Sequence, residues 1–571
     1  MKTKRLSIAL LTGMLLLSFA SIAQVNISNG YGFHIGPGAN IAFSGSSIML
    51  QDASKLTMDA TSKVYFLAPI TVTTGDINLA GGVAFTNGVS QTVSNFNMNV
   101  KDLTIGTNLT ISPNKRLTVN GTLVNNGSNN GLILESSALG TASLLHNTAG
   151  VQATVKRYIP NTNGENEFHM LSSPVAAQAI SPDFNISDGF YLWNEPTSEW
   201  IEFANENFTT ANGGTNNFVS GRGYAVSYST EVTKIFTGDL NQGTVSIPLS
   251  ASPTGINKTW NYVGNPYPSA INWDATGYTR NALENAVTNE AAMWVWNDIA
   301  QQYGVYINNS NTTLHNVTKN IAIGQGFWVK AATGGSFTMT NNVRQHADQA
   351  YLKSNNNTPN TLFATIVCEI NNYQDELIIT FGKTSDQGGA EKLMSPNTNV
   401  PSLYSIKYNE NWCINYLTNT DEHAIVPLGF KAGADANYTI TFTGVDDFTQ
   451  VILEDLKTGI KKNLKANNEY QFTAQTSDDA NRFLLRFKDA TAIAETTTIN
   501  PQIYYTDQKI NIFNPFTVPT TVQVFDINGR MITTFIAKYG ITDYNFDNPP
   551  AVYIIRLSNE NKYFTTKIVK W

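Results

Sequence analysis

The chain has 571 residues, with 36 Lys or Arg, 43 Asp or Glu and a formal net charge of −7. No basic patch stands out, which makes nucleic acids and anionic membrane surfaces poor candidate partners. The length calls for several domains, and two cysteines exclude a disulfide-stapled scaffold, so buried apolar side chains must stabilise each domain.

The N-terminus has the three zones of a secretory signal peptide, predicted over residues 1–23. Basic residues come first, the apolar stretch Leu6–Ala20 follows, and Ser21 and Ala23 supply the small residues that a signal peptidase requires. We expect cleavage between Ala23 and Gln24. The alternative, an uncleaved anchor, is disfavoured because the apolar stretch is shorter than the ~20 residues of a spanning helix. No other segment is long and apolar enough to span a membrane as a helix, so we expect no transmembrane span.

The sequence pattern of the remaining chain predicts an all-β, multidomain protein. Short runs rich in Val, Ile, Thr, Phe and Tyr alternate with Asn, Gly and Ser clusters, and Asn-Gly pairs recur at turns. Helical periodicity is almost absent, and Arg280–Val287 is the one short helix that we expect. Over residues 24–155 the runs are very short, with apolar residues at every second position, as in Ile48-Met-Leu50 and Leu117-Thr-Val119. This pattern predicts a right-handed β-solenoid whose coils stack on one another. A β-sandwich is the alternative, because no strict repeat length is visible.

Residues 156–350 contain an internal duplication. Tyr191-Leu-Trp-Asn194 is echoed by Trp294-Val-Trp-Asn297, and Gly221-Arg-Gly-Tyr-Ala-Val226 by Gly324-Gln-Gly-Phe-Trp-Val329, both at an offset of 103 residues. We expect two related β-sandwich units. The Gly-x-Gly elements run directly into strand-like sequence and not into a helix, which favours a turn or bulge over a phosphate-binding loop.

A further β-sandwich domain is predicted over residues 351–490. It contains both cysteines, Cys368 and Cys413. A disulfide between them is compatible with export but is not implied. Because Cys368 falls on the apolar face of its strand, the sequence favours a buried pair or two inert thiols. A small, polar linker, Asp489–Thr498, precedes the last domain.

Residues 491–571 form a C-terminal module of short strands around an Asn-Gly hairpin turn. The strand Val522–Phe525, the turn after it, the strand Val552–Arg556 and the terminal Thr566–Lys570 together resemble the type A C-terminal sorting domain of the type IX (Por) secretion system of Bacteroidota. The matching motif residues are Asp526, Asn528, Gly529, Arg530, Tyr553, Lys567 and Lys570. The resemblance implies that this small β-sandwich directs a folded periplasmic protein across the outer membrane. It also implies that the module is then removed, and that the cargo is released or attached to the cell surface.

The sequence shows no catalytic motif, so we predict a protein that is not an enzyme, with no catalytic, cofactor-binding or metal-binding residues. None of the six histidines has metal-ligand spacing. Glu195 and Glu199 flank a Trp-rich segment, and a pair of carboxylates is what glycoside hydrolysis needs. Their polar loop favours two solvated acids over a catalytic pair.

Seven of the nine tryptophans lie between residues 193 and 328. Exposed aromatic rings would stack on sugars, whereas the alternation in Trp294-Val-Trp296 favours rings buried in the two cores. The resulting hypotheses are, in order, an adhesin-like or structural surface component, a carbohydrate-binding surface protein with glycans or host-surface molecules as partners, and a glycan-active enzyme. Exposed Trp rings would favour the second, and a cleft with two or more carboxylates the third.

Overall fold

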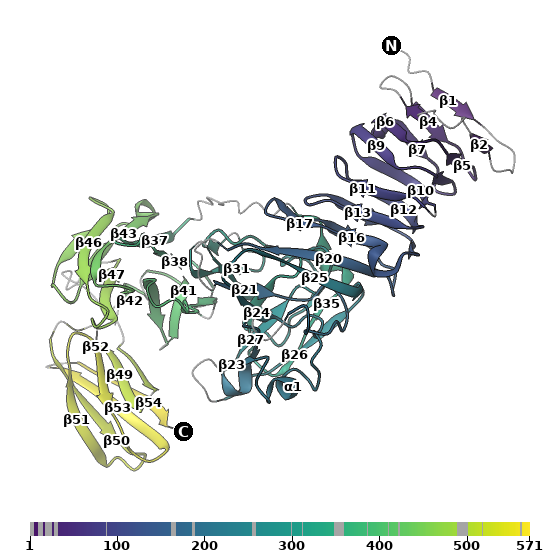
Figure 1. Ribbon diagram of the computed structural model, residues 1–571. Helices are drawn as coiled ribbons and strands as arrows, with labels where there is room; N and C mark the ends of the chain where they lie inside the picture. Colours follow the sequence, from purple (N-terminus) through teal and green to yellow (C-terminus); the bar gives the residue numbers. More distant parts are fainter. Residues whose placement is uncertain are drawn as a thin grey trace. The chain divides into compact units, whose positions relative to one another are not determined.

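In the computed structural model the regular secondary structure is almost entirely β-strand, which confirms the predicted all-β class (Figure 1). It has two compact units: unit 1 comprises Met1–Asp298, Asn308–Ser310 and Asn316–Lys353, and unit 2 comprises Ile299–Ile307, Asn311–His315 and Ser354–Trp571. The structure describes residues 5–8, 15–17, 25–27, 32–86, 88–161, 167–184, 189–253, 259–298, 300–310, 312–347, 359–384, 386, 388–408, 410–420, 423–487, 501–506, 508–514, 516, 518–559 and 562–570.

The first part of unit 1 is a stack of parallel strands, as the solenoid prediction requires. One sheet has the order β19-β14-β12-β10-β8-β5-β2, with β15 also paired to β12, and a second sheet contains β11-β13-β16-β20. The bounds in these sheets are β2 (Leu15–Leu17), β5 (Asn40–Phe43), β8 (Lys63–Phe66), β10 (Ile77–Phe85), β12 (Met98–Ile105), β14 (Arg116–Val119), β15 (Leu123–Asn125), β19 (Ser143–Leu145), β11 (Ser90–Val93), β13 (Asn108–Ile111), β16 (Leu132–Leu134) and β20 (Gln152–Ile159). Two smaller parallel sheets are β1 (Arg5–Ile8), β4 (Gly32–Ile35) and β7 (Leu56–Met58), and β3 (Val25–Ile27), β6 (Ile48–Asp52) and β9 (Ile70–Thr74).

Equivalent residues of successive coils lie side by side on the inner face of the solenoid. Ile41 aligns with Val64, Val64 with Val83, Val83 with Leu103 and Leu103 with Leu123. The intervals along the chain are therefore 23, 19, 20 and 20 residues. Because the coils differ in length, the repeat is regular in space but not in sequence.

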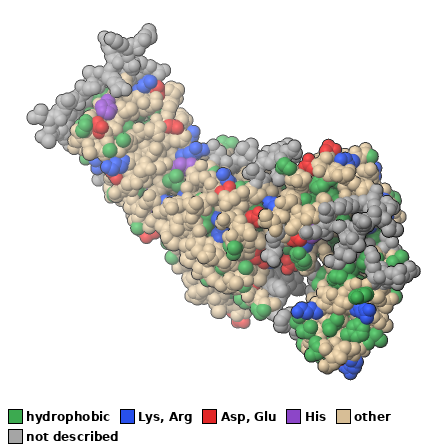
Figure 2. All heavy atoms as spheres, turned by 180° about the vertical axis from the view of Figure 1, so that it is seen from behind, with side chains coloured by type: hydrophobic (Ala, Val, Ile, Leu, Met, Phe, Trp, Pro, Cys, Tyr) green, Lys and Arg blue, Asp and Glu red, His purple; other side chains and the backbone are tan. Residues whose placement is uncertain are grey.

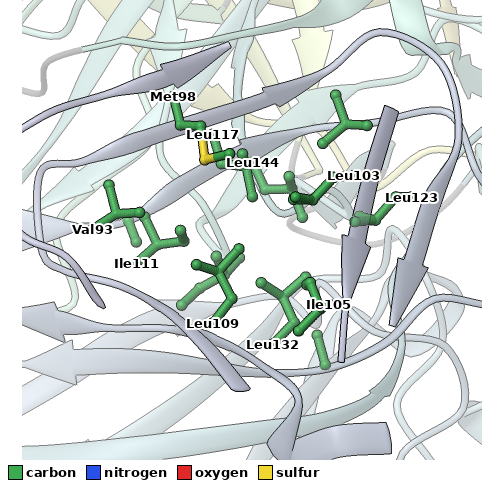
Figure 3. Close-up of a cluster of buried hydrophobic side chains, with 14 of the residues drawn as sticks. Val93, Met98, Leu103, Ile105, Leu109, Ile111, Leu117, Leu123, Leu132 and Leu144 are labelled. Carbon is green, nitrogen blue, oxygen red and sulfur yellow. The ribbon is translucent and has the colours of Figure 1, made fainter. Parts of the chain in front are cut away.

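The solenoid core is a continuous apolar ladder between the parallel sheets. Phe43, Phe66 and Phe85 stack in successive coils, with ring centroids 5.9 and 5.6 Å apart. Figure 3 shows Met98, Leu117 and Leu144 from one sheet pointing toward side chains of the other. Each coil therefore buries its inner face against its neighbours, as expected for a repeat too small to fold alone.

The duplicated region follows without a break, because the predicted boundary at residues 155 and 156 falls inside β20. This strand continues the solenoid sheet through β16 and also pairs antiparallel with β25 (Val232–Asp239). One hydrophobic cluster extends from Ile35 in the solenoid to Phe236 in the first repeat. The solenoid and the first repeat thus share one core.

The two repeats have the same strand order. The first is β21-β24-β22-β23, and the second contains β27-β34-β30. The bounds are β21 (Glu167–Leu171), β22 (Tyr191–Asn194), β23 (Glu199–Glu202), β24 (Tyr224–Tyr228), β27 (Trp260–Gly264), β30 (Ala292–Asn297) and β34 (Gly326–Lys330). The remaining described strands of unit 1 are the hairpin β17 (Ser136–Ser137) and β18 (Gly140–Thr141), between β16 and β19 in the chain, and β26 (Val245–Leu249), β28 (Ala270–Asn272), β29 (Tyr278–Thr279), β33 (Asn320–Ile321), β35 (Gly335–Met339) and β36 (Arg344–Gln345).

The repeats also share strand register. Tyr191 pairs with Ala225 in the first repeat, and Trp294 pairs with Trp328 in the second; both members are shifted by 103 residues. Trp193 and Trp296 hold equivalent positions on β22 and β30, whereas Gly223 lies directly before β24 and its counterpart Gly326 is the first residue of β34. The two sequence motifs therefore occupy matching places in matching sheets.

The predicted helix Arg280–Val287 is wrong. Leu283 forms a β-bridge with Ala331, and the next backbone N–H donates to the carbonyl oxygen of Lys330. Asn285 has φ of 55°, outside the right-handed helical region. Backbone pairing with the end of β34 and the residue after it thus replaces the hydrogen bonds of a helix. The α-helix described in the structure is α1, Phe208–Ala211; short 3₁₀ turns occur at Ala53–Lys55, Ser128–Asn130, Glu195–Thr197, Asn341–Val343 and Val445–Asp447.

Unit 2 contains a large sheet followed by a small sandwich. The large sheet has the order β45-β44-β47-β42-β40-β41-β38-β37-β43-β46, with β39 paired to β41. Its strands are β37 (Thr361–Cys368), β38 (Gln374–Thr380), β39 (Gly389–Glu391), β40 (Ser402–Lys407), β41 (Glu410–Tyr416), β42 (Ile425–Lys431), β43 (Ala436–Thr443), β44 (Ile452–Asp455), β45 (Lys461–Asn463), β46 (Glu469–Ala474) and β47 (Asn481–Arg486); β31 (Gln302–Ile307) and β32 (Thr313–Leu314) form a hairpin in the same unit. Cys368 and Cys413 are buried, free thiols.

The C-terminal module is a sandwich of two small antiparallel sheets, β48-β49-β52 and β51-β50-β53-β54. Its strands are β48 (Gln502–Thr506), β49 (Lys509–Asn514), β50 (Thr520–Phe525), β51 (Met531–Ala537), β52 (Gly540–Asn545), β53 (Ala551–Asn559) and β54 (Lys562–Lys570). It has its own apolar core, which includes Val522, Val524 and Ile555. The predicted linker before it lies outside the described residues, and the predicted domain boundaries stay predictions.

Candidate functional sites

The turn of the C-terminal module is built around Asp526. Its Oδ1 accepts hydrogen bonds from the backbone N–H groups of Arg530 and Asn528, both at 2.9 Å, and its Oδ2 accepts one from Arg530 Nε at 3.2 Å. The N–H of Arg530, followed by that of Asn528, holds the pKa of this carboxyl below its ordinary value. Gly529 has φ of 80°, which a turn of this kind requires. The structure thus brings four predicted motif residues together in one exposed turn.

The other predicted motif residues lie apart from this turn. Tyr553 is buried, and its hydroxyl donates to the carbonyl oxygen of Pro549 at 2.7 Å. Lys570 Nζ donates to the carbonyl oxygen of Phe546 at 3.1 Å. Lys567 is exposed on the outer face of β54. Tyr553 and Lys570 therefore stabilise the module, whereas Lys567 is available to a partner.

The C-terminal module exposes apolar side chains on its outer surface. Seen from behind, hydrophobic and basic side chains gather there (Figure 2). The exposed large apolar residues of this module are Val518, Ile527, Met531, Ile536, Val552, Tyr563 and Val569. Of these, Ile527 and Met531 lie within and directly after the motif turn. The predicted cleavage residues Ala23 and Gln24 lie outside the described residues.

The tryptophans of the duplicated region are mostly core residues. Six of the seven are at most 9% exposed; they are Trp193, Trp260, Trp273, Trp294, Trp296 and Trp328. Trp200 differs, with 36% of its surface exposed. The sequence-based preference for core rings therefore describes six of them, and Trp200 is the exception.

Trp200 is held by a cluster of aromatic rings. It pairs with Trp193 across the β22–β23 hairpin, and their ring centroids lie 5.6 Å apart at 66°. Tyr262 and Trp328 contact it at 5.4 and 5.6 Å, also at steep angles. Such edge-to-face contacts fix the orientation of the exposed indole.

A pocket of about 540 Å³ adjoins this cluster. β22, β23, α1, β26 and β27 contribute to its wall, and most of these elements are labelled in the lower part of unit 1 in Figure 1. The lining residues are Trp193, Asn194, Glu195, Pro196, Thr197, Glu199, Trp200, Ile201, Asn205, Asn207, Thr210, Ala211, Arg222, Ile247, Pro248, Ser250, Asn261, Tyr262 and Val263. They come from both repeats and from β26, which follows the first repeat. We call this the Trp200 pocket.

Glu195 and Glu199 both line the Trp200 pocket but differ in environment. Glu195 is buried, so the prediction that it is solvated is wrong. Its carboxylate accepts hydrogen bonds from the N–H and hydroxyl of Ser252, at 2.8 and 2.9 Å, and from the N–H of Thr259 at 2.7 Å. These three hydrogen bonds hold the Glu195 side chain in place and tie it to the chain segment that leads into β27. Glu199 is exposed, as predicted.

Arg222 is the one basic residue among the described lining residues of the Trp200 pocket. Its guanidinium donates to the carbonyl oxygen of Ala211 at 2.6 Å and to Asn212 Oδ1 at 3.2 Å. Burial lowers its pKa. Its backbone bridges Val263, so Arg222 joins the two repeats beneath the pocket.

A buried ionic cluster lies in unit 2 around Asp375. Asp375 Oδ1 accepts from Lys392 Nζ at 2.5 Å and lies 3.2 Å from His315 Nε2, and its Oδ2 accepts from the N–H of Leu403 at 2.7 Å. Burial alone would raise the pKa of Asp375, but Lys392 and His315 lower it below its ordinary value. Asp375 and Lys392 are at most 3% exposed, so their ion pair is shielded from water.

The described part of the chain contains no group of three or more His, Cys, Asp or Glu residues arranged to hold a metal ion. In the same part, no helix has the length and apolar character needed to span a membrane.

These observations define an all-β protein with a solenoid, tandem related sandwiches, a pocket in the second of these regions and a C-terminal sandwich. The chain belongs to the family described as "Domain of unknown function (DUF8693)", whose model matches residues 80–487. No curated protein matches the chain. A solved structure titled "Biofilm associated protein - BSP domain" is similar at 10% identity, over 76% of this chain and 98% of that chain, with a TM-score of 0.16.

Proposed function

We propose that this protein is exported by the type IX secretion system and acts at the outer cell surface as an adhesin-like or structural component. Two features of the sequence support the proposal: the order of basic, apolar and small residues before Gln24, and the C-terminal motif. The observation that carries it is the C-terminal module itself. Its motif turn is exposed, and the exposed apolar residues Ile527 and Met531 lie within it and directly after it, which gives export machinery an accessible surface to recognise.

The decisive experiment separates export from folding. Deletion of residues 499–571 should leave the rest of the chain folded but retained in the periplasm. The same segment, fused to a folded reporter with a signal peptide, should carry the reporter to the surface or the medium. Protease accessibility on intact cells measures both outcomes. Normal surface levels of the truncated protein would show that the type IX assignment is wrong.

A matched pair of glycine variants tests the motif turn. Gly529→Val forces a β-branched residue to φ of 80°, and Gly459→Val forces the same residue to φ of 75° in the preceding domain. An added Cβ has open space at both positions, so each substitution costs only backbone strain, about 1–2 kcal/mol. We expect Gly529→Val to reduce surface display and Gly459→Val to leave it unchanged. Equal effects would mean that stability, and not the turn, controls export.

A further inference from the structure

The Trp200 pocket has the size and shape of a small-ligand site. Its volume of about 540 Å³ lies within the range of ~300–1,000 Å³ typical of such sites. Its floor is preformed, since Glu195 and Arg222 are each fixed by hydrogen bonds to neighbouring segments. A ligand would therefore meet a rigid wall and lose little binding energy to reorganisation.

Trp200 gives the pocket an exposed aromatic platform. Its indole is held by Trp193, Tyr262 and Trp328 and remains 36% exposed, unlike the other six rings of the region. The π-face of an indole carries negative charge density, and the C–H groups on one side of a sugar ring carry weak positive charge. A sugar ring that stacks on Trp200 places its weakly positive C–H groups against the negative face of the indole, and the two attract.

The rim of the pocket supplies groups that match sugar hydroxyls. Asn205, Asn207 and Thr210 are exposed and line the pocket from the segment that leads into α1 and from α1 itself. Asn205 Oδ1 already accepts the N–H of Asn207, which leaves its amide NH₂ as a donor. An amide offers both a donor and an acceptor, and a sugar hydroxyl is also both.

The charge of the pocket selects among saccharides. Glu195 and Arg222 are hydrogen-bonded to other parts of the protein. Glu199 is therefore the charged residue that is exposed among the described lining residues. Glu206, between the two asparagines of the rim, is also exposed and acidic. A carboxylate, sulfate or sialyl group entering the pocket would be repelled by these acids.

We infer that the Trp200 pocket binds a neutral saccharide, stacked on Trp200 and hydrogen-bonded by Asn205 and Asn207. This deepens the proposed surface role and rests on it, because it names the class of ligand that an adhesin-like protein would recognise. Both carboxylate oxygens of Glu195 already accept hydrogen bonds from Ser252 and Thr259. We therefore assign binding, and not hydrolysis, to this pocket.

The test uses the purified full-length mature protein on an array of neutral oligosaccharides and of acidic ones that carry uronic acid, sulfate or sialic acid. The strongest neutral binder is then titrated by calorimetry. We expect neutral glycans to bind and acidic glycans not to bind. Trp200→Ala should weaken binding at least tenfold, Trp200→Phe less, and Asn207→Ala severalfold. Glu199→Gln should retain neutral binding and increase binding of acidic glycans.

Phe168→Ala is the matched control, since Phe168 is an exposed aromatic residue of the same unit that does not line the pocket. It should bind like the unmodified protein. Absence of any neutral binder, a preference for acidic glycans, or equal affinity of the Trp200→Ala and Phe168→Ala variants would overturn the inference. Export measured on cells is independent of this result, so a surface-located protein with no glycan binding would remove the saccharide site and leave the proposed export intact.

Discussion

His146 makes the stability of unit 1 depend on pH. Its ring is 1% exposed, directly after β19. Burial, with a further contribution from Arg344, lowers the pKa of His146 to about 4. Arg344 is close because its Nη1 donates to the carbonyl oxygen of His146 at 2.6 Å. The imidazole is therefore neutral in the folded protein at pH 7.

The sign and size of the effect follow from proton linkage. In the unfolded chain the pKa of a histidine is ~6.5, so below that pH the unfolded state takes up a proton that the folded state excludes until about pH 4. The contribution of His146 to stability is complete above pH 6.5 and is lost as the pH falls toward 4. The difference in pKa corresponds to a loss of about 3 kcal/mol in the free energy of unfolding.

The assay compares the unmodified protein with His146→Gln and His146→Leu in urea unfolding at several pH values between 4 and 7.5. Tryptophan fluorescence is the probe, since seven of the nine tryptophans lie between residues 193 and 328, within unit 1. Both variants should lose less stability on acidification than the unmodified protein, by about 3 kcal/mol over this window. Parallel stability profiles for all three proteins would refute the reasoning.

Three further outcomes are expected. Phe66→Ala removes the middle ring of the solenoid stack and should destabilise unit 1 by about 3–5 kcal/mol in urea unfolding; a loss near zero would mean that the stack does not support the solenoid. Asp455→Asn removes the buried anion of Arg482 and leaves only the more distant Asp478, 3.7 Å away, at a cost of about 3–5 kcal/mol in unit 2, and the double variant with Arg482→Met should recover part of that loss in thermal unfolding. Cys368 and Cys413 should resist thiol reagents in the folded protein and react fully after unfolding without reductant, as read by mass spectrometry; protection that persists until reductant is added would reveal a disulfide.

The solenoid shows what local patterns can and cannot predict. Alternation identified its strands and their inner face, because period-2 burial depends on neighbouring residues only. Alternation alone could not predict that the coils stack. Ile41 pairs with Val64 and Val64 pairs with Val83, but the two spacings along the chain differ, 23 and 19 residues. The sandwich alternative stayed open in the sequence for that reason.

Long-range contacts account for the errors elsewhere. Glu195 lies in a polar segment, yet Ser252 and Thr259 bury it from more than fifty residues away. The Trp200 pocket was missed for the same reason, because its wall joins residues near 200 to residues near 250 and 262. One signal was present: Trp200 falls opposite Trp193 across a short turn, which places the two rings on the same face of a hairpin.

The duplicated glycines connect the repeat to the pocket. Gly221 and Gly324 have φ of 80° and 61°, so the first glycine of each Gly-x-Gly element forms a turn before a buried strand, as the sequence indicates. The second glycine has a different role. A Cβ added to Gly223 or to Gly326 would overlap the side chain of Tyr262, which therefore lies between the two repeats against a glycine of each. The ring of Tyr262 in turn lines the Trp200 pocket and supports Trp200. The glycine motif was thus duplicated with the fold, and the close approach that it permits places an aromatic wall where the two repeats meet.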